Sequence, residues 1–542
     1  MTAANPTADD GALAPAAPPP PSAPKAPPAA HPPLHGPALL LGTLALSLAT
    51  FMNVLDSSIA NVSLPAIAGD LGVSPAQGTW VITSFGVANA ISVPLTGWLT
   101  QRFGAVRLFT MSVLLFVLTS WLCGFAHSLE ALVFFRVLQG LVAGPMIPLS
   151  QTLLLASYPP AMAGTALALW GVTTLVAPVV GPLLGGWITD NIAWPWIFYI
   201  NVPVGLLAAM LTWSIYRKRE TPVRKLPIDT VGLSLLVLWV GALQLMLDKG
   251  KELDWFASGE IVTMAVIAVV AFAVFVVWEL TDKHPVVDIR LFARRNFAFG
   301  ALALSVAYAL FFGNVVLLPL WLQQWMGYTA TSAGMALAPV GVFAILLTPL
   351  VGRKVAVWDP RRMATLAFIV FSLVLWMRSH FTVETDFMHI LIPTLIQGGA
   401  MAFFFIPLTT LTLAGLPPER IPSAAGLSNF VRITAGAMGT SIATTLWESR
   451  AAMHHAHLTE GLVQGQGVFA ATLDKLTAAG LSQAQALAQI NRLIDQQAFT
   501  RAADDIFIGS AGIFLLLIGL IWLTRRPPRA AGGAPVDAGG AH

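Results

Sequence analysis

Charge is scarce in this chain of 542 residues: only 10% of them are Asp, Glu, Lys or Arg, whereas 56% are hydrophobic. Repeated apolar stretches of about 20 residues are typical of membrane spans, so the composition excludes an ordinary soluble domain. A net charge of +3 would suggest nucleic acid as a partner of a soluble protein. Here the basic residues follow membrane topology instead, and we expect no nucleic-acid partner.

Other absences exclude whole classes of chemistry. The single cysteine, Cys123, lies in an apolar stretch, which rules out an intramolecular disulfide and argues against thiol chemistry or a Cys-rich metal site. The ATP-binding motif G-x-x-x-x-G-K-[ST] is missing, as are the hydrolase motifs G-x-S-x-G and H-E-x-x-H. His454, His455 and His457 have no Cys or paired carboxylate nearby, so we interpret them as solvated. We therefore expect no enzyme, no metal and no cofactor.

Hydropathy predicts an all-α polytopic membrane protein with fourteen transmembrane helices. The approximate limits of the spans are 37–68, 77–100, 105–126, 129–155, 163–190, 195–216, 228–248, 258–281, 296–325, 331–355, 361–379, 387–414, 423–447 and 506–525.

The basic residues alternate between the loops on the two sides of these spans. Twenty of the 29 Lys and Arg residues fall on one side and seven on the other, where we count Arg378; Arg136 and Arg432 lie within spans. The positive-inside rule makes the first side cytoplasmic, together with both termini. The first 35 residues contain eleven prolines and no signal-peptide core, which predicts a disordered cytoplasmic tail.

Two cytoplasmic loops repeat the same pattern, a glycine followed by basic residues between two spans. The first runs from Gly97 to Arg107 and the second from Gly352 to Arg362. Two six-span halves with two spans inserted between them fit an alternating-access transporter. Because short cytoplasmic loops are commonly basic, the repeat alone is equally explained by topology.

Asp56 interrupts a stretch from Gly36 to Gly69 that contains no other charged residue. An Asp at the centre of a transmembrane helix costs about 2.5 to 3.5 kcal/mol, so such a residue is a functional candidate. A low dielectric favours the neutral form of a carboxyl, which would allow proton uptake and release. The alternative is a polar residue that only fixes helix packing.

Arg136 is the predicted partner of Asp56. Asp56 precedes Pro65 by nine residues and Arg136 follows Glu130 by six, which places them about 13 and 9 Å below the outer face, at a rise of about 1.5 Å per residue. They would then pair when Asp56 is ionised and separate when it is protonated. A static structural ion pair is the alternative.

Four stretches together carry a family signature: Leu55–Pro65 (LDSSIANVSLP), Arg136–Pro145 (RVLQGLVAGP), Ala177–Gly186 (APVVGPLLGG) and Trp194–Gly205 (WPWIFYINVPVG). The chain resembles the major facilitator superfamily in its fourteen-span drug:proton antiporter branch. The resemblance implies a fold of two six-helix halves plus two inserted spans. It also implies a proton-driven multidrug exporter, located in the inner membrane as one component of a tripartite efflux pump.

The implied domains follow from the spans. They are a Pro-rich tail at 1–36, an N-terminal half at 37–216, the inserted spans with their flanking loops at 217–295, a C-terminal half at 296–525 that contains a periplasmic loop at 448–505, and a tail at 526–542. The implied partners are small-molecule drugs, protons and membrane lipid, with a periplasmic adaptor (membrane fusion) protein and an outer-membrane channel of the TolC type.

The resemblance also implies roles for single residues. It links Arg136 with proton transfer. It assigns Pro178, Gly181, Pro182 and Gly185 to an antiporter motif, in which the prolines kink the helix and the glycines allow close approach of another helix. Gly97, Arg102 and Gly104 match part of a cytoplasmic gating loop, but Gln101 replaces its usual acid. We therefore expect Arg102 and Arg107 to meet helix C-termini instead.

The spans offer no second carboxylate for a cationic drug, whereas Arg136 and Arg432 suit weakly acidic compounds. We therefore expect neutral or weakly acidic hydrophobic substrates. Candidate wall residues, each of which also suits plain helix packing, are Asn53, Phe85, Asn89, Asn314, Phe404, Asn429 and Arg432. A proton-coupled importer on the same fold is the alternative function, which the direction of transport would discriminate. A channel or sensor has less support, because rings of charge or carbonyl filters are missing.

The loop 448–505 carries apolar residues at mostly helical spacing: Leu473, Leu476, Leu481, Leu487, Ile490, Leu493, Ile494 and Phe499. This pattern predicts amphipathic helices. They would either pack on the outer face of the transporter or dock a periplasmic partner.

Overall fold

The chain divides into two units, Met1–Pro32 and Pro33–His542, and the architecture below is that of the second. A computed structural model describes residues 2 and 32–526, apart from 74, 160–161, 224–226, 228, 251–252, 329, 338, 355–357 and 465. Most of the tails predicted at 1–36 and 526–542 therefore lies outside the described residues.

The helices up to residue 216 follow the apolar stretches of the sequence closely. They are α1 (Gly36–Asp70), α2 (Pro75–Gly78), α3 (Trp80–Ser92), α4 (Thr96–Phe103), α5 (Ala105–Gly124), α6 (Leu129–Ala143), α7 (Met146–Ser157), α8 (Ala163–Asn191), α9 (Trp196–Tyr199) and α10 (Asn201–Tyr216), with the short 3-10 turn η1 (Val93–Leu95) between α3 and α4. We call this group the N-terminal bundle.

Two helices follow before the second group begins. These are α11 (Thr230–Lys249) and α12 (Gly259–Thr281), with the 3-10 turns η3 (Trp255–Ala257) and η4 (Ile289–Ala293). The C-terminal bundle consists of α13 (Arg295–Gln324), α14 (Ala330–Leu337), α15 (Pro339–Lys354), α16 (Pro360–Arg378), α17 (Phe387–Leu413), η5 (Pro418–Arg420), α18 (Ile421–Gln464), α19 (Gln466–Ala478) and α20 (Gln483–Trp522).

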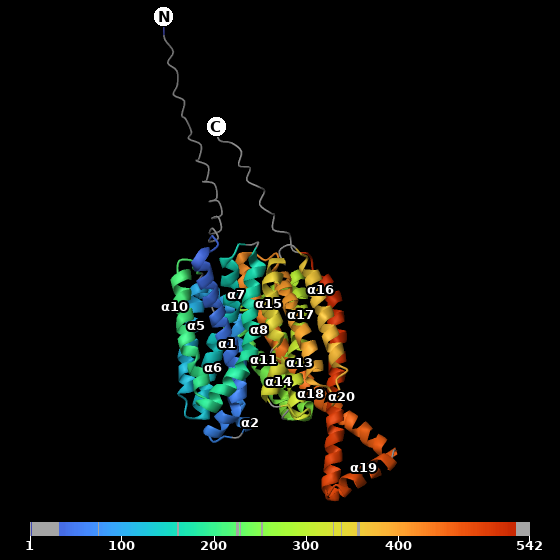
Figure 1. Cartoon of the computed structure of the whole chain (residues 1–542). Coiled ribbons are helices and arrows are strands. Elements are labelled where there is room, and N and C mark those ends of the chain that lie inside the picture. Colours follow the sequence, from blue (N-terminus) through green and yellow to red (C-terminus); the bar gives the residue numbers. More distant parts are fainter. Residues whose placement is uncertain are drawn as a thin grey trace. The chain divides into compact units, whose positions relative to one another are not determined.

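The long helices run side by side, and those of each bundle gather together (Figure 1). Each bundle has its own apolar core: one is built from α1, α3, α5 to α8 and α10, and the other from α13 to α18 and α20. Two further clusters join the bundles. In one, α8 packs against α15, α16 and α17; in the other, α3 and α18 share apolar contacts with α11 and α12.

Twelve helical segments in the described residues are long and apolar enough to cross a membrane. The two other expected spans, 163–190 and 423–447, coincide with α8 and α18. Each of these packs along candidate spans, α8 on α1 and α18 on α13 and α20. Large apolar side chains also remain exposed on the outer helices, for example Val269 and Val277 of α12. Such faces need an apolar surrounding, which a bilayer supplies.

The predicted loop 448–505 is helical, as its spacing indicates, and α18, α19 and α20 provide it. The far ends of α18 and α20 project beyond the bundle with α19 between them (Figure 1). Phe499 stacks on Trp325 at 4.3 Å, and Gln496 Nε2 donates to the Trp325 carbonyl at 2.7 Å. Leu487 and Leu493 stay exposed. One part of this segment therefore packs on the transporter, and another part leaves apolar side chains free.

Arg378 differs from its expected place among the exposed loop residues. It ends α16 but is buried, and its Nη2 donates to Gln397 Oε1 at 2.7 Å and to Thr394 Oγ1 at 3.2 Å. Hydropathy places an arginine at a helix end in water. Here two polar groups of the neighbouring α17 accept from Nη2, whereas the buried Nε has no hydrogen-bond partner within the described residues. The contacts with α17 therefore offset only part of the cost of burying this arginine.

Candidate functional site

Asp56 and Arg136 meet inside the N-terminal bundle. Arg136 Nη1 lies 2.6 Å from Asp56 Oδ2, and both side chains are at most 1% exposed. Asp56 comes from the middle of α1 and Arg136 from α6, where Ser128 caps the helix by accepting from the Ala131 N–H. Two charges buried this completely need each other, because either ion alone would be far more costly in a low dielectric.

Neutral donors complete the shell around the carboxylate. Asn201 Nδ2 of α10 donates to Asp56 Oδ1 at 2.9 Å, and Gln139 Nε2 of α6 donates to the same oxygen at 3.2 Å. Ser120 Oγ of α5 accepts from Gln139 Nε2 at 2.7 Å and from Asn201 Nδ2 at 3.3 Å. With Arg136 included, three side chains donate hydrogen bonds to the Asp56 carboxylate.

Arg136 is held by more than the carboxylate. Its Nη1 also donates to Gln139 Oε1 at 2.6 Å, and its Nε donates to the Val81 carbonyl of α3 at 2.9 Å. The Phe85 ring lies 4.2 Å from the centre of the guanidinium. Arg136 thus has contacts with α3 that do not depend on Asp56.

A cavity of about 200 Å³ adjoins this pair. Its wall combines the N-terminal bundle, the inserted helix α11 and the C-terminal bundle. The lining residues are Ser57, Ile82, Phe85, Gly86, Asn89, Ala90, Arg136, Gln244, Ile433 and Thr434. Of the predicted wall residues, Phe85 and Asn89 are here, and Arg136 connects this space with Asp56.

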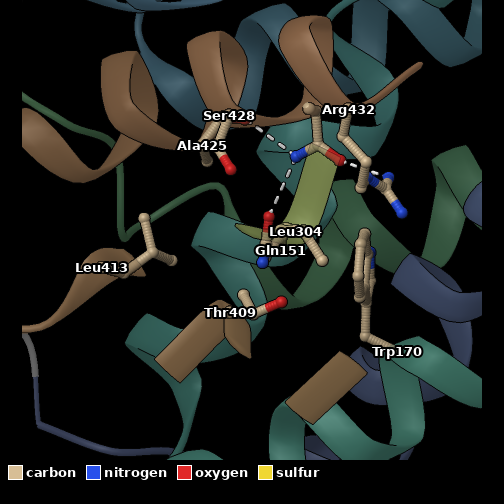
Figure 2. A pocket seen from close by; sticks show the side chains of 9 residues that line it. Gln151, Trp170, Leu304, Thr409, Leu413, Ala425, Ser428 and Arg432 are labelled. Carbon is tan, nitrogen blue, oxygen red and sulfur yellow. Dashed lines mark hydrogen bonds between the residues drawn. The ribbon is translucent and has the colours of Figure 1, made fainter. Parts of the chain in front are cut away.

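The second cavity surrounds Arg432 and measures about 10 Å³, which is room for about one water molecule. Asn429 Nδ2 donates to Gln151 Oε1 of α7 at 3.2 Å and so joins the two bundles, while Arg432 Nη2 donates to Asn429 Oδ1 at 2.5 Å (Figure 2). The Arg432 guanidinium lies 4.6 Å from the Tyr308 ring. The predicted residues Asn429 and Arg432 therefore form a closed layer in this conformation.

The predicted antiporter motif lies on α8 against α1. A Cβ at Gly181 would come within 2.6 Å of Ser58 Oγ, and a Cβ at Gly185 within 2.6 Å of Ile59 Cγ1. Ser58 and Ile59 are the second and third residues after Asp56, so these two glycines set the distance between α8 and the helix that carries the carboxylate. The side chains of Pro178 and Pro182 lie outside the described part of α8.

Close contacts seal the bundles at the end that carries the two repeated glycines. A Cβ at Gly97 of α4 would lie 2.2 Å from Ser423 Oγ and 2.8 Å from Ser423 Cα of α18. A Cβ at Gly352 of α15 would lie 2.8 Å from the Gly164 carbonyl of α8. The repeat noticed in the sequence thus places one glycine at each seam between the bundles. We call these two contacts the glycine seal.

Gly104 stands between α4 and α5 with φ +88°, a conformation that favours glycine. Glu220 occupies the adjoining space and accepts from the backbone N–H groups of Val106 and Arg107 at 3.0 and 2.9 Å. Arg107 lies 3.9 Å from the same carboxylate. The expectation that Arg107 meets a helix C-terminus is wrong, because Glu220, distant in sequence, supplies a carboxylate at the N-terminus of α5. Arg102 lies 5.5 Å from the Trp98 ring.

A second carboxylate stands at the start of α16. Asp359 accepts from the Arg361 backbone N–H at 3.0 Å, and its Oδ2 lies 2.8 Å from Arg361 Nη2 and 3.9 Å from Arg526 Nε. Burial acts to raise the pKa of Asp359, but the hydrogen bonds and charge of Arg361, aided by Arg526, lower it below its ordinary value. Asp359 and Arg361 both belong to the C-terminal bundle. Their ion pair therefore stabilises that bundle and does not hold the glycine seal closed.

Three predicted wall residues line neither of these two cavities. Asn53 Nδ2 donates to the Ala143 carbonyl of α6 at 3.2 Å, and Asn314 Nδ2 donates to Ser510 Oγ of α20 at 3.2 Å. Phe404 is fully buried and lies 4.7 Å from the Phe405 ring in the core of the C-terminal bundle. Their observed contacts are those of helix packing.

Sequence reasoning did not select several residues that complete the site. Gln139 and Asn201 were visible inside the signature stretches, and the spacing of Arg136 and Gln139 places both on one helix face. Gly352 was visible as the repeat of Gly97. Gln244 carried no signal, because an inserted span far along the chain has to fold against α3 before its role is seen.

Comparison with known proteins agrees with this architecture. A family model described as Major Facilitator Superfamily matches residues 46–440. The chain is 54% identical to the multidrug export protein EmrB of Escherichia coli (strain K12), over 94% of this chain and 99% of that protein. It is 49% identical to the fatty acid resistance protein FarB of Neisseria gonorrhoeae, over 93% of this chain and 99% of that one.

A solved structure has a related fold. The human organic anion transporter MFSD10 (TETRAN) superposes with a TM-score of 0.59 at 13% sequence identity, covering 90% of this chain and 100% of that one. At this identity the similarity speaks for the fold alone.

Proposed function

The chain belongs to the Major Facilitator Superfamily, and on that premise we propose that it is a proton-driven multidrug efflux antiporter. It is a multi-pass membrane transporter and not an enzyme. Its cargo in this proposal is hydrophobic, neutral or weakly acidic. The names of two relatives, a multidrug export protein and a fatty acid resistance protein, support export of apolar compounds.

The buried pair of Asp56 and Arg136 carries the proposal. Its 2.6 Å contact is the state in which Asp56 is ionised. A proton on Asp56 removes the ionic attraction and weakens the hydrogen bonds from Gln139 and Asn201. The α1 helix, which carries Asp56, also packs on Gly181 and Gly185 of α8. Protonation of Asp56 therefore affects the contact between α1 and α8, where the glycines allow small sliding movements.

The closed glycine seal and the cavity beside Arg136 support the following order of events. Gly97 and Gly352 close the end predicted to be cytoplasmic, and the Asn429–Gln151 hydrogen bond adds a second closed layer. The cavity of about 200 Å³ next to Arg136 lies beyond that layer. In this conformation Asp56 takes up a proton from the periplasm and the drug leaves. The proton departs once the bundles rock to open the cytoplasmic end.

The energy available from one proton fits this task. A membrane potential of 100 mV releases about 2.3 kcal/mol per charge moved. Each 1.4 kcal/mol raises a concentration ratio about tenfold, so one Asp56 per cycle supports export against a gradient of roughly 40-fold, before any pH gradient is added.

We propose for the whole chain an inner-membrane location with both termini in the cytoplasm. The domains are a half at 37–216, inserted spans at 217–295 and a half at 296–525. The projecting segment formed by the ends of α18 and α20 with α19 lies in the periplasm, where Leu487 and Leu493 are exposed. A periplasmic adaptor and an outer-membrane channel complete a tripartite pump in this proposal.

Asp56→Asn tests the function. Asn keeps the size of the side chain and cannot carry the proton, so drug transport driven by a pH gradient in proteoliposomes should vanish while drug binding persists. Proton release from detergent-solubilised protein on adding drug should vanish with it. Asp386→Asn, at an exposed outer carboxylate, is the matched control and should transport normally. Undiminished pumping by the Asp56 variant would refute the proposal, and drug accumulation in place of export would favour an importer.

A further inference from the structure

The helix α11 lies in the seam between the two bundles. The Trp239 ring of α11 contacts the Phe430 ring of α18 at 5.6 Å. Ser441 Oγ of α18 donates to the Leu247 carbonyl at 3.2 Å, and Thr83 Oγ1 of α3 donates to Asp248. In the described residues, α12 packs chiefly on α11 and leaves most of its other faces exposed. Of the two inserted helices, α11 is therefore the one that touches both moving bundles.

One polar residue of α11 reaches the central cavity. Gln244 is partly buried and lines the space of about 200 Å³ beside Phe85, Asn89, Arg136 and Thr434. Its amide makes no hydrogen bond with any residue in the described part of the chain. An amide that only filled a helix seam would be satisfied by its neighbours or would point to lipid headgroups. Gln244 instead places a free donor and a free acceptor at the cavity wall.

Two other wall residues have unused polar atoms. Asn89 Oδ1 and Thr434 Oγ1 are both buried, and neither has a hydrogen-bond partner within the described residues. Asn89 belongs to the N-terminal bundle, Thr434 to the C-terminal bundle and Gln244 to the inserted helix. The remaining wall is largely apolar, and Arg136 is already paired with Asp56. The wall thus matches an uncharged ligand better than an ion.

We propose that Gln244 is a specificity-determining residue for cargo, and that the inserted helix α11 is a working part of the binding site. This rests on the proposed export function and names the cargo class of that cavity: neutral aromatic compounds that carry at least one O–H or N–H donor. The Gln244 amide oxygen accepts from the donor and so fixes the polar end of the molecule, beside Asn89, while Phe85 and Ile433 contact the ring.

A pair of probes that differ in one donor tests this assignment. A biaryl phenol and its methyl ether have nearly the same shape, but only the phenol donates a hydrogen bond. In proteoliposomes, Gln244→Leu should raise KM for the phenol about two- to tenfold, the effect expected when one hydrogen bond at a partly desolvated site is lost. Its kcat should not change, and KM for the ether should change less than twofold.

Matched variants separate this role from a purely structural one. Leu238→Ala, at an exposed position of the same helix, should leave both KM values unchanged. Gln244→Asn keeps the amide but shortens the side chain, so its KM for the phenol should fall between those of the wild type and Gln244→Leu. It also serves as the test protein if the Leu variant does not fold. Equal KM shifts for both probes, no shift, or a loss of kcat alone would overturn the proposal.

Failure here is distinguishable from failure of the proposed function. If Gln244 variants transport both probes as the wild type does while Asp56→Asn abolishes pumping, the chain remains a proton-driven exporter and only the role of α11 falls. If Asp56→Asn pumps normally, the export mechanism falls whatever Gln244 does.

Discussion

The glycine seal yields a quantitative prediction for Gly352→Ala. An added methyl group would meet the Gly164 carbonyl at 2.8 Å and Thr165 Cα at 2.9 Å. Both are backbone atoms of α8 that cannot rotate away, so α15 and α8 have to separate. In the cytoplasm-open state of the proposed cycle these helices are already apart. The substitution should therefore penalise only the closed state.

The size of the penalty follows from overpacking. Inserting a methyl group into a tightly packed contact costs about 1 to 3 kcal/mol. Alanine also has a helix propensity about 1 kcal/mol better than that of glycine, but this gain applies to the open and the closed state alike and cancels. The population of the open state should rise by about 5- to 150-fold, at 1.4 kcal/mol per factor of ten.

Labelling of an introduced thiol measures this shift. Thr409 is buried and lines the cavity of about 10 Å³ behind the seal, so Thr409→Cys should react slowly with a membrane-impermeant reagent added from the cytoplasmic side. In the Gly352→Ala background its labelling rate should rise by the factor above. The native thiol, Cys123, is buried in the N-terminal bundle, and labelling without the reporter corrects for it.

Gly341→Ala provides the control on the same helix, because no described atom lies within 4 Å of the added Cβ. It should leave the labelling rate unchanged. An unchanged rate in Gly352→Ala, or an equal rise in both variants, would refute the idea that this contact holds the cytoplasmic end closed. Gly97→Ala, which opposes Ser423 across the other seam, should act in the same direction as Gly352→Ala.

Three further predictions concern the pair, the helix cap and the α8 motif. Arg136→Leu leaves the ionised Asp56 without its cation and should lower the free energy of unfolding by about 3 to 5 kcal/mol. The melting temperature of this variant should partly recover as pH falls, since protonation of Asp56 removes the uncompensated charge. A loss of stability that does not depend on pH would contradict this. Asp359→Ala removes a cap and an ion pair, and should cost about 1 to 2 kcal/mol at pH 7. Because the pKa of Asp359 is lowered in the folded protein, the wild-type advantage is complete above about pH 4 and fades as pH falls through the folded pKa; an advantage that grows in acid would exclude the assignment. Gly181→Ala should reduce transport through its contact with Ser58 Oγ at 2.6 Å, and Ser58→Gly should restore it; no rescue would mean that the glycine acts elsewhere.

Much of this molecule follows from local sequence. Hydropathy located the apolar helices, because the transfer of an apolar helix into a bilayer depends on composition. Most helix ends lie within a few residues of the expected limits, but α18 and α20 extend well beyond the limits 423–447 and 506–525. The spans that were expected at 163–190 and 423–447 are helical too. Asp56 stood out for the same reason, since one charge in a long apolar stretch is visible without any knowledge of its neighbours.

The sequence did not reveal which residues contact these functional side chains. Depth along the helices brought Asp56 and Arg136 to the same level, but depth does not say which helices are adjacent. The contacts of Asp56 with Asn201, of Gly104 with Glu220, and of Gly352 with α8 join segments separated by about 110 to 190 residues. Arg378 was counted among the loop residues for the same reason. Its partners on α17 become neighbours only when α16 and α17 pack together.

The sequence by itself thus determined that the chain is a helical membrane protein, where its spans lie and which carboxylate is exceptional. Tertiary structure alone decided that α11 enters the wall of the cavity, that two repeated glycines close both seams, and that Arg432 lies in a closed layer. The physical reason is that insertion into lipid is a property of each helix separately. The lateral choice of neighbours instead depends on the shape and the few polar groups of two facing surfaces, which have no counterpart in the periodicity of either helix.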